Sequence, residues 1–200
     1  MTTRRDLCTL FAAGTLLSLV PVEAVRAQSV EAHLMTAALK PRPADDPPGF
    51  FLSAAWEFDL SRALVDCLRR GIPLYFLYEF EVKRRRWYWA NKTIAEAHLI
   101  ERLSFSPLTR TYRVSRGGLT QTFESLDAAL PIVKDIVEWR VADLAPLYEY
   151  DPEDLDARVR MRLDLTKLPK PLQVSIGGNS DWNLESDWES VPVPPMRSAS

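Results

Sequence analysis

The sequence predicts an α+β domain made mainly of antiparallel β-sheet, as a sandwich or a curled sheet, with two inserted helices. Three observations support this fold class. Several segments alternate apolar and polar residues with a period of two, as half-buried strands do. Two glycines between two such segments predict a hairpin. Two other segments repeat apolar residues every three or four positions behind a serine that can cap a helix.

The first elements follow from proline content and from the period of two. Residues 30–39 are mildly apolar and rich in alanine, which fits a first strand and also fits a helix. Residues 40–49 are rich in proline, which predicts a turn or linker. Residues 50–60 alternate cleanly and place Trp56 on an apolar face, so we expect a half-buried strand there.

The period then changes to that of a helix. Ser61 can cap a helix whose apolar stripe includes Leu64 and Cys67, and Gly71 predicts its end. A second clean alternation over residues 74–83 predicts a strand. Residues 93–105 have the alanine and glutamate content of a helix, but the neighbouring strands favour an extended segment, and we predict a strand.

The second half of the chain repeats this alternation of strands and a helix. A hairpin is expected around Gly117 and Gly118, and Ser125 can cap a helix whose apolar stripe continues to Val137. Pro131 should kink that helix or delay its start. The remaining expected elements are strands at 158–165 and 172–176 and a disordered tail at 191–200.

Residues 1–27 have the layout of a secretory signal peptide. Arg4 and Arg5 form a positive start, residues 7–22 are apolar, and small residues up to Ala27 fit a cleavage site. An uncleaved membrane anchor is the alternative, but the apolar stretch is short for a span. The paired arginines fit the twin-arginine export route as well as the general one. We therefore expect a periplasmic protein.

Cleavage after Ala27 would leave a single domain over residues 28–190, followed by the tail. Lys and Arg number 25 against 27 Asp and Glu, so the chain lacks the basic excess of a nucleic-acid-binding protein. The sequence has no phosphate-binding loop, no dinucleotide motif and no G-x-S-x-G motif, and we expect no cofactor. His33, His98 and Cys67 lack the spacing of metal ligands, so no metal site is expected.

Single residues that could carry chemistry also have plain structural explanations. His98 and Glu96 can be a ligand pair, although a solvated pair is the simpler interpretation. Cys67 lies on the apolar stripe of its helix, which favours a buried structural thiol over a nucleophile. Glu79 and Glu81 lie on one face of a strand, and paired carboxylates of a hydrolase would have to converge from separate elements. We assign no catalytic residue.

Basic and aromatic residues follow one another over residues 83–89, a run that ends in Arg86, Trp87, Tyr88 and Trp89. This mixture fits contact with an anionic envelope partner or with a membrane surface. The plainer interpretation is a strand end with both tryptophans in the core and the arginines in water. We treat these four residues as candidates for binding.

Two further tryptophans lie in the polar, turn-like residues 181–188. Trp182 and Trp188 either pack back onto the sheet as a lid or form an interaction surface. They complete the set of predicted binding residues. The alternating arginines Arg158, Arg160 and Arg162 are expected to form a solvated face.

Several segments in a specific order carry a family resemblance: residues 71–76 (GIPLYF), 86–89 (RWYW), 103–114 (LSFSPLTRTYRV), 123–130, 168–174 (LPKPLQV), 181–184 (DWNL) and 187–188 (DW). Together they resemble an uncharacterised family of exported proteobacterial proteins known only as a domain of unknown function. The resemblance implies a signal-bearing, strand-rich domain that is often encoded beside a membrane sensor kinase of the nitrogen-regulation type. It implies no reaction and no catalytic residues.

The sequence therefore predicts a non-enzymatic envelope protein that binds a protein partner, and the periplasmic region of a sensor kinase is one hypothesis for that partner. The alternative is an envelope hydrolase without a recognisable motif. A third hypothesis is contact with the membrane surface through residues 84–89. A deep pocket with convergent ionisable groups would favour the enzyme, whereas an apolar patch or groove would favour binding.

Overall fold

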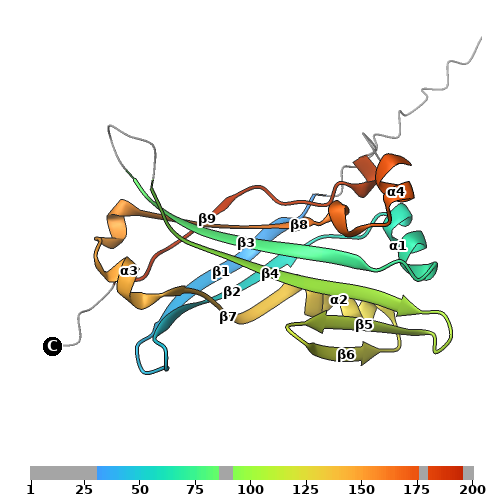
Figure 1. Ribbon diagram of the computed structural model, residues 1–200, viewed down its shortest axis with the longest axis horizontal. Helices are drawn as coiled ribbons and strands as arrows, with labels where there is room; N and C mark the ends of the chain where they lie inside the picture. Colours follow the sequence, from blue (N-terminus) through green and yellow to red (C-terminus); the bar gives the residue numbers. More distant parts are fainter. Residues whose placement is uncertain (1–30, 86–91, 176–179, 196–200) are drawn as a thin grey trace, which may run out of the picture.

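The computed structural model describes residues 31–85, 92–175 and 180–195, which form two antiparallel sheets packed over one core (Figure 1). The predicted signal peptide with its cleavage site after Ala27 lies outside the described residues, as do Arg86, Trp87, Tyr88 and Trp89. The sheets are not closed into a barrel. The predicted α+β fold class with mainly antiparallel sheet is confirmed.

One sheet has three strands in the order β1-β2-β7, and the other has six in the order β6-β5-β4-β3-β8-β9. Every neighbouring pair of strands is antiparallel. The strands are β1 His33–Arg42, β2 Gly49–Glu57, β3 Leu74–Arg84, β4 Lys92–Ser106, β5 Thr111–Arg116, β6 Leu119–Phe123, β7 Asp135–Asp143, β8 Leu155–Leu163 and β9 Glu189–Val191.

The α-helices are α1 Arg62–Arg69, α2 Leu126–Lys134, α3 Leu144–Tyr148 and α4 Lys170–Ser175, and the 3-10 helices are η1 Pro152–Asp154, η2 Leu165–Lys167 and η3 Ser180–Trp182. In Figure 1, α1 and α4 lie at one end of the sheets and α3 at the other, while α2 lies behind the β5–β6 hairpin. The helices α1 and α2 correspond to the two predicted helices. The shorter α3 and α4 were not predicted as helices.

The core lies between the two sheets and is filled by the apolar faces that the period of two predicts. From β2 it takes Phe50, Leu52 and Trp56, all at most 2% exposed. The Trp56 ring lies 5.2 Å from the ring of Tyr78 on β3, centroid to centroid. This contact joins the three-stranded sheet to the six-stranded sheet.

The helix α1 begins and ends where the sequence predicts. The Ser61 hydroxyl oxygen accepts a hydrogen bond from the Leu64 backbone N–H at 3.2 Å, and its own proton is donated to the Asp181 carbonyl at 2.5 Å. Gly71, just beyond the helix, has a φ of +81°, which glycine adopts without strain. Ser61 therefore caps α1 and also ties it to the segment that contains η3.

We expect Ser61→Ala to lower the free energy of unfolding by about 1–2 kcal/mol, because it removes a helix cap and a tertiary hydrogen bond. Ser125→Ala is the matched control, since Ser125 caps α2 in the same way through the Ala128 N–H. Urea denaturation of both variants measures the difference. An equal loss in the two variants would contradict a stabilising role for the bond to Asp181.

One predicted element is wrong around residue 136. The second helix was expected to continue through Ile136 and Val137, but α2 ends at Lys134 and both residues belong to β7. Pro131 lies inside α2 and does not delay its start at Leu126. The sequence of β7 does not alternate apolar and polar residues regularly. Its pairing with β2 shifts register twice, and Glu138 has a φ of +55°.

Three more segments differ from the prediction. Residues 172–175 of the strand expected at 172–176 belong instead to the helix α4, and residue 176 lies outside the described residues. The Pro169 carbonyl, just before the helix, accepts from the Leu172 N–H at 2.9 Å. A proline before and inside its first turn suits a helix start, because the first N–H groups of a helix need no partner within it. The segment at 30–39, which fits a strand or a helix by sequence, contains the start of the strand β1. This strand continues to Arg42, into the turn expected at 40–49. Val191, placed in the disordered tail, is buried in β9.

Candidate functional site

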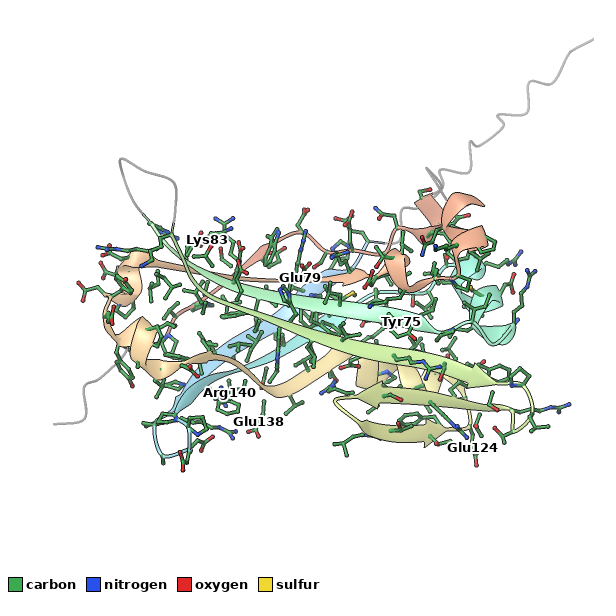
Figure 2. All side chains as sticks on the ribbon, in the orientation of Figure 1. Tyr75, Glu79, Lys83, Glu124, Glu138 and Arg140 are labelled. Carbon is green, nitrogen blue, oxygen red and sulfur yellow. The ribbon has the colours of Figure 1, made fainter. Side chains whose placement is uncertain are left out.

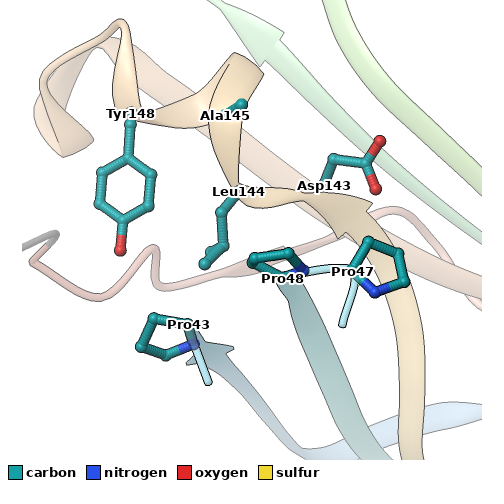
Figure 3. A pocket seen from close by; sticks show the side chains of 7 residues that line it. All are labelled: Pro43, Pro47, Pro48, Asp143, Leu144, Ala145 and Tyr148. Carbon is teal, nitrogen blue, oxygen red and sulfur yellow. The ribbon is translucent and has the colours of Figure 1, made fainter. Parts of the chain in front are cut away.

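An apolar pocket of about 700 Å³ lies between the β1–β2 turn and α3 (Figure 3). Its walls are three prolines from the turn and residues from the end of β7 and from α3: Pro43, Pro47, Pro48, Asp143, Leu144, Ala145 and Tyr148. In Figure 3 the rings of Pro43, Pro48 and Tyr148 and the side chain of Leu144 surround a common space. The volume falls in the range of pockets that hold small molecules or peptide side chains.

Strand pairing brings the two halves of the pocket together. β2 starts opposite the end of β7, with Gly49 paired to Asp143, so the proline turn before β2 meets the helix after β7. A Cβ atom on Gly49 would lie 2.8 Å from Arg140 Nε and 3.1 Å from the Ala142 carbonyl oxygen, so a larger residue there would displace the Arg140 side chain and press on the β7 backbone. The Leu144 N–H also donates to the Pro48 carbonyl at 3.4 Å.

The helix α3 is anchored on one side and open on the other. Leu144 and Leu147 are buried in the core, whereas Ala145 is exposed and Tyr148 is 40% exposed. An exposed phenol ring beside proline rings is a surface to which an apolar group can add contact area. The exposed ring of Tyr148 on α3 is therefore available for contact with a group bound in the pocket.

One carboxylate lines the pocket, and further acidic residues lie in or next to the two elements that form it. The Asp143 carboxylate accepts from Arg140 Nη2 at 2.6 Å, and Figure 3 shows it on the side away from Tyr148. Asp45 and Asp46 lie in the proline turn, and Glu149 follows α3. Of the seven residues that line the pocket only Asp143 and Tyr148 are titratable, so this set offers no pair of carboxylates for acid–base chemistry.

The sequence does not predict this pocket. It predicts a turn or linker over residues 40–49 and indicates no role for residues 143–148. The proline-rich composition was the available signal on one side, and the apolar α3 sequence was the signal on the other. Nothing in either segment alone indicates that they meet, because their contact depends on the long-range pairing of β2 with β7.

The outer face of the six-stranded sheet carries a paired charge cluster. Glu79 on β3 accepts from Arg160 Nε at 2.7 Å and from Arg162 Nε at 2.9 Å, both on β8 (Glu79 is labelled in Figure 2). Burial alone would raise the pKa of Glu79, but the two guanidinium groups outweigh it and lower the pKa below its usual value. The arginines predicted as a solvated face are thus half-buried, and two of them are bound to one carboxylate.

The two predicted binding tryptophans that the structure describes lie in different surroundings. Trp182 is half-buried in η3 and packs against the core, in the segment that Ser61 binds. Trp188 is half-buried on the outer face, with the Arg160 guanidinium carbon 4.6 Å from its ring centroid. Neither lines the apolar pocket.

A buried polar cluster joins α2 to the six-stranded sheet. Glu101 on β4 is fully buried and its carboxylate forms an ion pair with Arg116 on β5. Arg116 Nη2 also donates to the carbonyls of Ile132 at 3.3 Å and Asp135 at 3.0 Å, at the end of α2. Burial raises the pKa of Glu101 to about 7, although Arg116 lowers it in part. Glu101 could be noticed in the sequence as a charge on the core face, between Leu99 and Leu103.

The remaining candidates stay apart. Cys67 is buried in α1, and burial raises the pKa of its thiol while Arg70 opposes the shift. His98 and Glu96 are exposed on β4, opposite Glu79 and Glu81 respectively. Within the described ranges, no three His, Cys, Asp or Glu side chains are grouped as a metal site would need.

Among the helices of the described residues, none has the length and apolarity needed to cross a membrane.

Comparison with known proteins places the chain in a family. No curated protein and no solved structure is significantly similar to it. Residues 39–192, which span both sheets from the end of β1 to the residue after β9, match the sequence model of a family described as a domain of unknown function, DUF4390. The match covers well over half of the chain, and the chain therefore belongs to this family of uncharacterised domains.

Proposed function

We propose that this protein is a non-enzymatic binding domain whose apolar pocket receives an apolar, proline-containing segment of a protein partner. The observation that carries the proposal is the wall of the pocket, which combines three proline rings with Leu144 and the exposed ring of Tyr148. Grooves lined by aromatic rings recognise proline-rich segments because such segments are already extended and lose little entropy on binding.

The charges around the pocket indicate the chemistry of the partner segment. Asp46 belongs to the proline turn and Glu149 directly follows α3, while Asp45 in the same turn lies 3.9 Å from the Arg42 guanidinium. A partner segment with basic residues beside its apolar ones would be attracted to this rim. We infer an apolar segment flanked by lysine or arginine.

The cellular setting is part of the same proposal. Residues 1–27 have the layout of a secretory signal, and the family resemblance implies an exported protein. We place the protein in the bacterial envelope, with the periplasmic region of a sensor kinase as the first partner to test. Residues 86–89 with Trp182 and Trp188 stay predicted contacts, separate from the pocket.

A photoreactive phenylalanine analogue at Ala145, introduced into the full chain in cells of the source organism, tests the proposal. We expect ultraviolet light to crosslink one envelope protein reproducibly. Tyr148→Ala in the same chain should reduce the crosslink about tenfold, because it removes the exposed ring, and a loss of about 1.4 kcal/mol has this effect. The crosslinked peptide should contain proline and basic residues by mass spectrometry.

The matched control carries the same analogue at Leu108, which is 95% exposed and lies in the β4–β5 turn. The same partner captured equally from both positions would contradict a pocket-specific contact. Absence of any specific adduct at Ala145 would overturn the proposal. Hydrolysis of an added compound by the purified chain would favour the alternative function, an envelope hydrolase.

A further inference from the structure

The edge strand β6 is an unprotected surface for strand pairing. Among the strands that the structure describes, β6 pairs with β5 alone, and Figure 1 shows it along the lower border of the sheet, with α2 behind the hairpin. Four of its five residues are exposed, including Leu119 at 78%. Its sequence, Leu-Thr-Gln-Thr-Phe, has no charge and no proline. Charged side chains and prolines are two of the devices by which natural sheets prevent pairing at their edges.

The turn before β6 determines which backbone groups face the open edge. Gly117 and Gly118 both have positive φ, +54° and +87°, and form a two-residue hairpin turn. Arg116 and Leu119 flank this turn and are the first hydrogen-bonded pair. Backbone hydrogen bonds alternate between the two sides of a strand. The N–H and C=O groups that point toward β5 are therefore those of Leu119, Gln121 and Phe123. The N–H and C=O groups of Thr120 and Thr122 then point outward.

The sequence of β6 reads almost the same in both directions around Gln121. Threonine stands on each side of Gln121, and an apolar residue stands at each end, Leu119 and Phe123. We propose that β6 pairs antiparallel with β6 of a second copy of this chain, around a two-fold axis at Gln121. Thr120 then lies opposite the partner's Thr122, and Leu119 lies opposite the partner's Phe123.

This register satisfies each requirement of a two-fold strand pair. The outward groups of Thr120 and Thr122 meet as hydrogen-bonded pairs, about four bonds in all. Each Leu119, now largely in water, is covered by an aromatic ring, and such cross-strand pairs stabilise sheets. No like charges meet within the strand. The interface is small, so we expect a dimer that dissociates on dilution.

Disulfide trapping tests the register. Gln121→Cys in a full chain that also carries Cys8→Ser places the new thiol opposite itself, in a non-hydrogen-bonded pair with Cα atoms about 4.5 Å apart. This separation lies within the range of disulfides, about 4.4–6.8 Å. Cys67 is buried and does not compete. We expect rapid formation of a covalent dimer under mild oxidation.

Thr120→Cys is the matched control, because its thiol would face the partner's position 122 and lie about 7–8 Å from its own copy. It should form little dimer alone but should crosslink to a chain with Thr122→Cys. Equal rates for the Gln121→Cys and Thr120→Cys homodimers would overturn the proposed pairing.

A proline substitution tests the dimer without a crosslink. Thr122→Pro removes an outward N–H, which an edge strand tolerates, whereas Gln121→Pro removes an N–H that bonds to β5. In sedimentation velocity at micromolar concentrations, we expect the natural chain to show a concentration-dependent dimer. Thr122→Pro should be monomeric with an unchanged Tm, while Gln121→Pro should lower the Tm. A natural chain that stays monomeric throughout would contradict the proposal, whatever the pocket binds.

Discussion

Replacing Trp56 by alanine is expected to lower the free energy of unfolding by about 3–5 kcal/mol, the range for deleting a large aromatic side chain from a core. Trp56 is 2% exposed and its ring contacts Tyr78 across the two sheets at 5.2 Å. Its removal leaves a cavity at the junction between the sheets. Urea denaturation followed by circular dichroism measures the loss.

Trp56→Phe is the control for this prediction. The Trp56 indole nitrogen is buried, and none of the described residues is its hydrogen-bond partner. Phenylalanine therefore removes an unpaired polar atom and keeps most of the ring contact, so we expect a clearly smaller loss than with alanine. A loss from Trp56→Ala below about 1 kcal/mol would contradict the tight junction between the sheets.

The stability of the protein is expected to decrease as the pH rises from about 4.5 to above 7, through the titration of Glu101. Burial raises the pKa of this carboxyl from 4.5 to about 7, so the folded state holds its proton more tightly than the unfolded state does. The contribution of Glu101 is therefore fully present below pH 4.5 and is lost as the pH rises through 7. At about 1.4 kcal/mol per pKa unit, the change is about 3 kcal/mol.

Glu101→Gln isolates this effect, because the amide keeps the shape of the side chain and does not titrate. We expect the free energy of unfolding of the natural chain, relative to Glu101→Gln, to fall by about 3 kcal/mol between pH 4 and pH 8. Other groups that titrate in both chains cancel in this comparison. A constant difference between the two chains across that range would contradict the raised pKa of Glu101.

Elements with a regular period were predictable from the sequence, and elements held by long-range contacts were not. The strands β2, β3, β4, β5, β6 and β8 and the starts of α1 and α2 are confirmed, because alternation and serine caps are local signals. β7 was missed because its bulges, with Glu138 at a φ of +55°, break the period of two. The helix α4 was missed because the sequence alternates Leu172, Val174 and Ile176 with polar residues, as a strand does.

The candidate site was less predictable than the fold. The sequence predicts binding through aromatic residues. Of those that the structure describes, Trp182 packs on the core and Trp188 lies against Arg160. The apolar pocket instead combines a proline turn with a short helix about a hundred residues later, and the long-range pairing of β2 with β7 brings them together. A period or a motif within one segment cannot show such a contact.

Nuclear magnetic resonance of the ¹⁵N-labelled full chain, titrated with a panel of proline-containing apolar peptides flanked by lysine, tests whether the apolar pocket binds such segments. Binding in the pocket predicts saturable shifts of the amide signals of Ala145, Tyr148 and the turn before Gly49, and Tyr148→Ala should raise the peptide concentration needed for half-saturation about tenfold. Shifts that instead gather around Trp188 and Arg160, or the absence of saturable shifts with any peptide of the panel, would contradict the assignment of the pocket as the binding site.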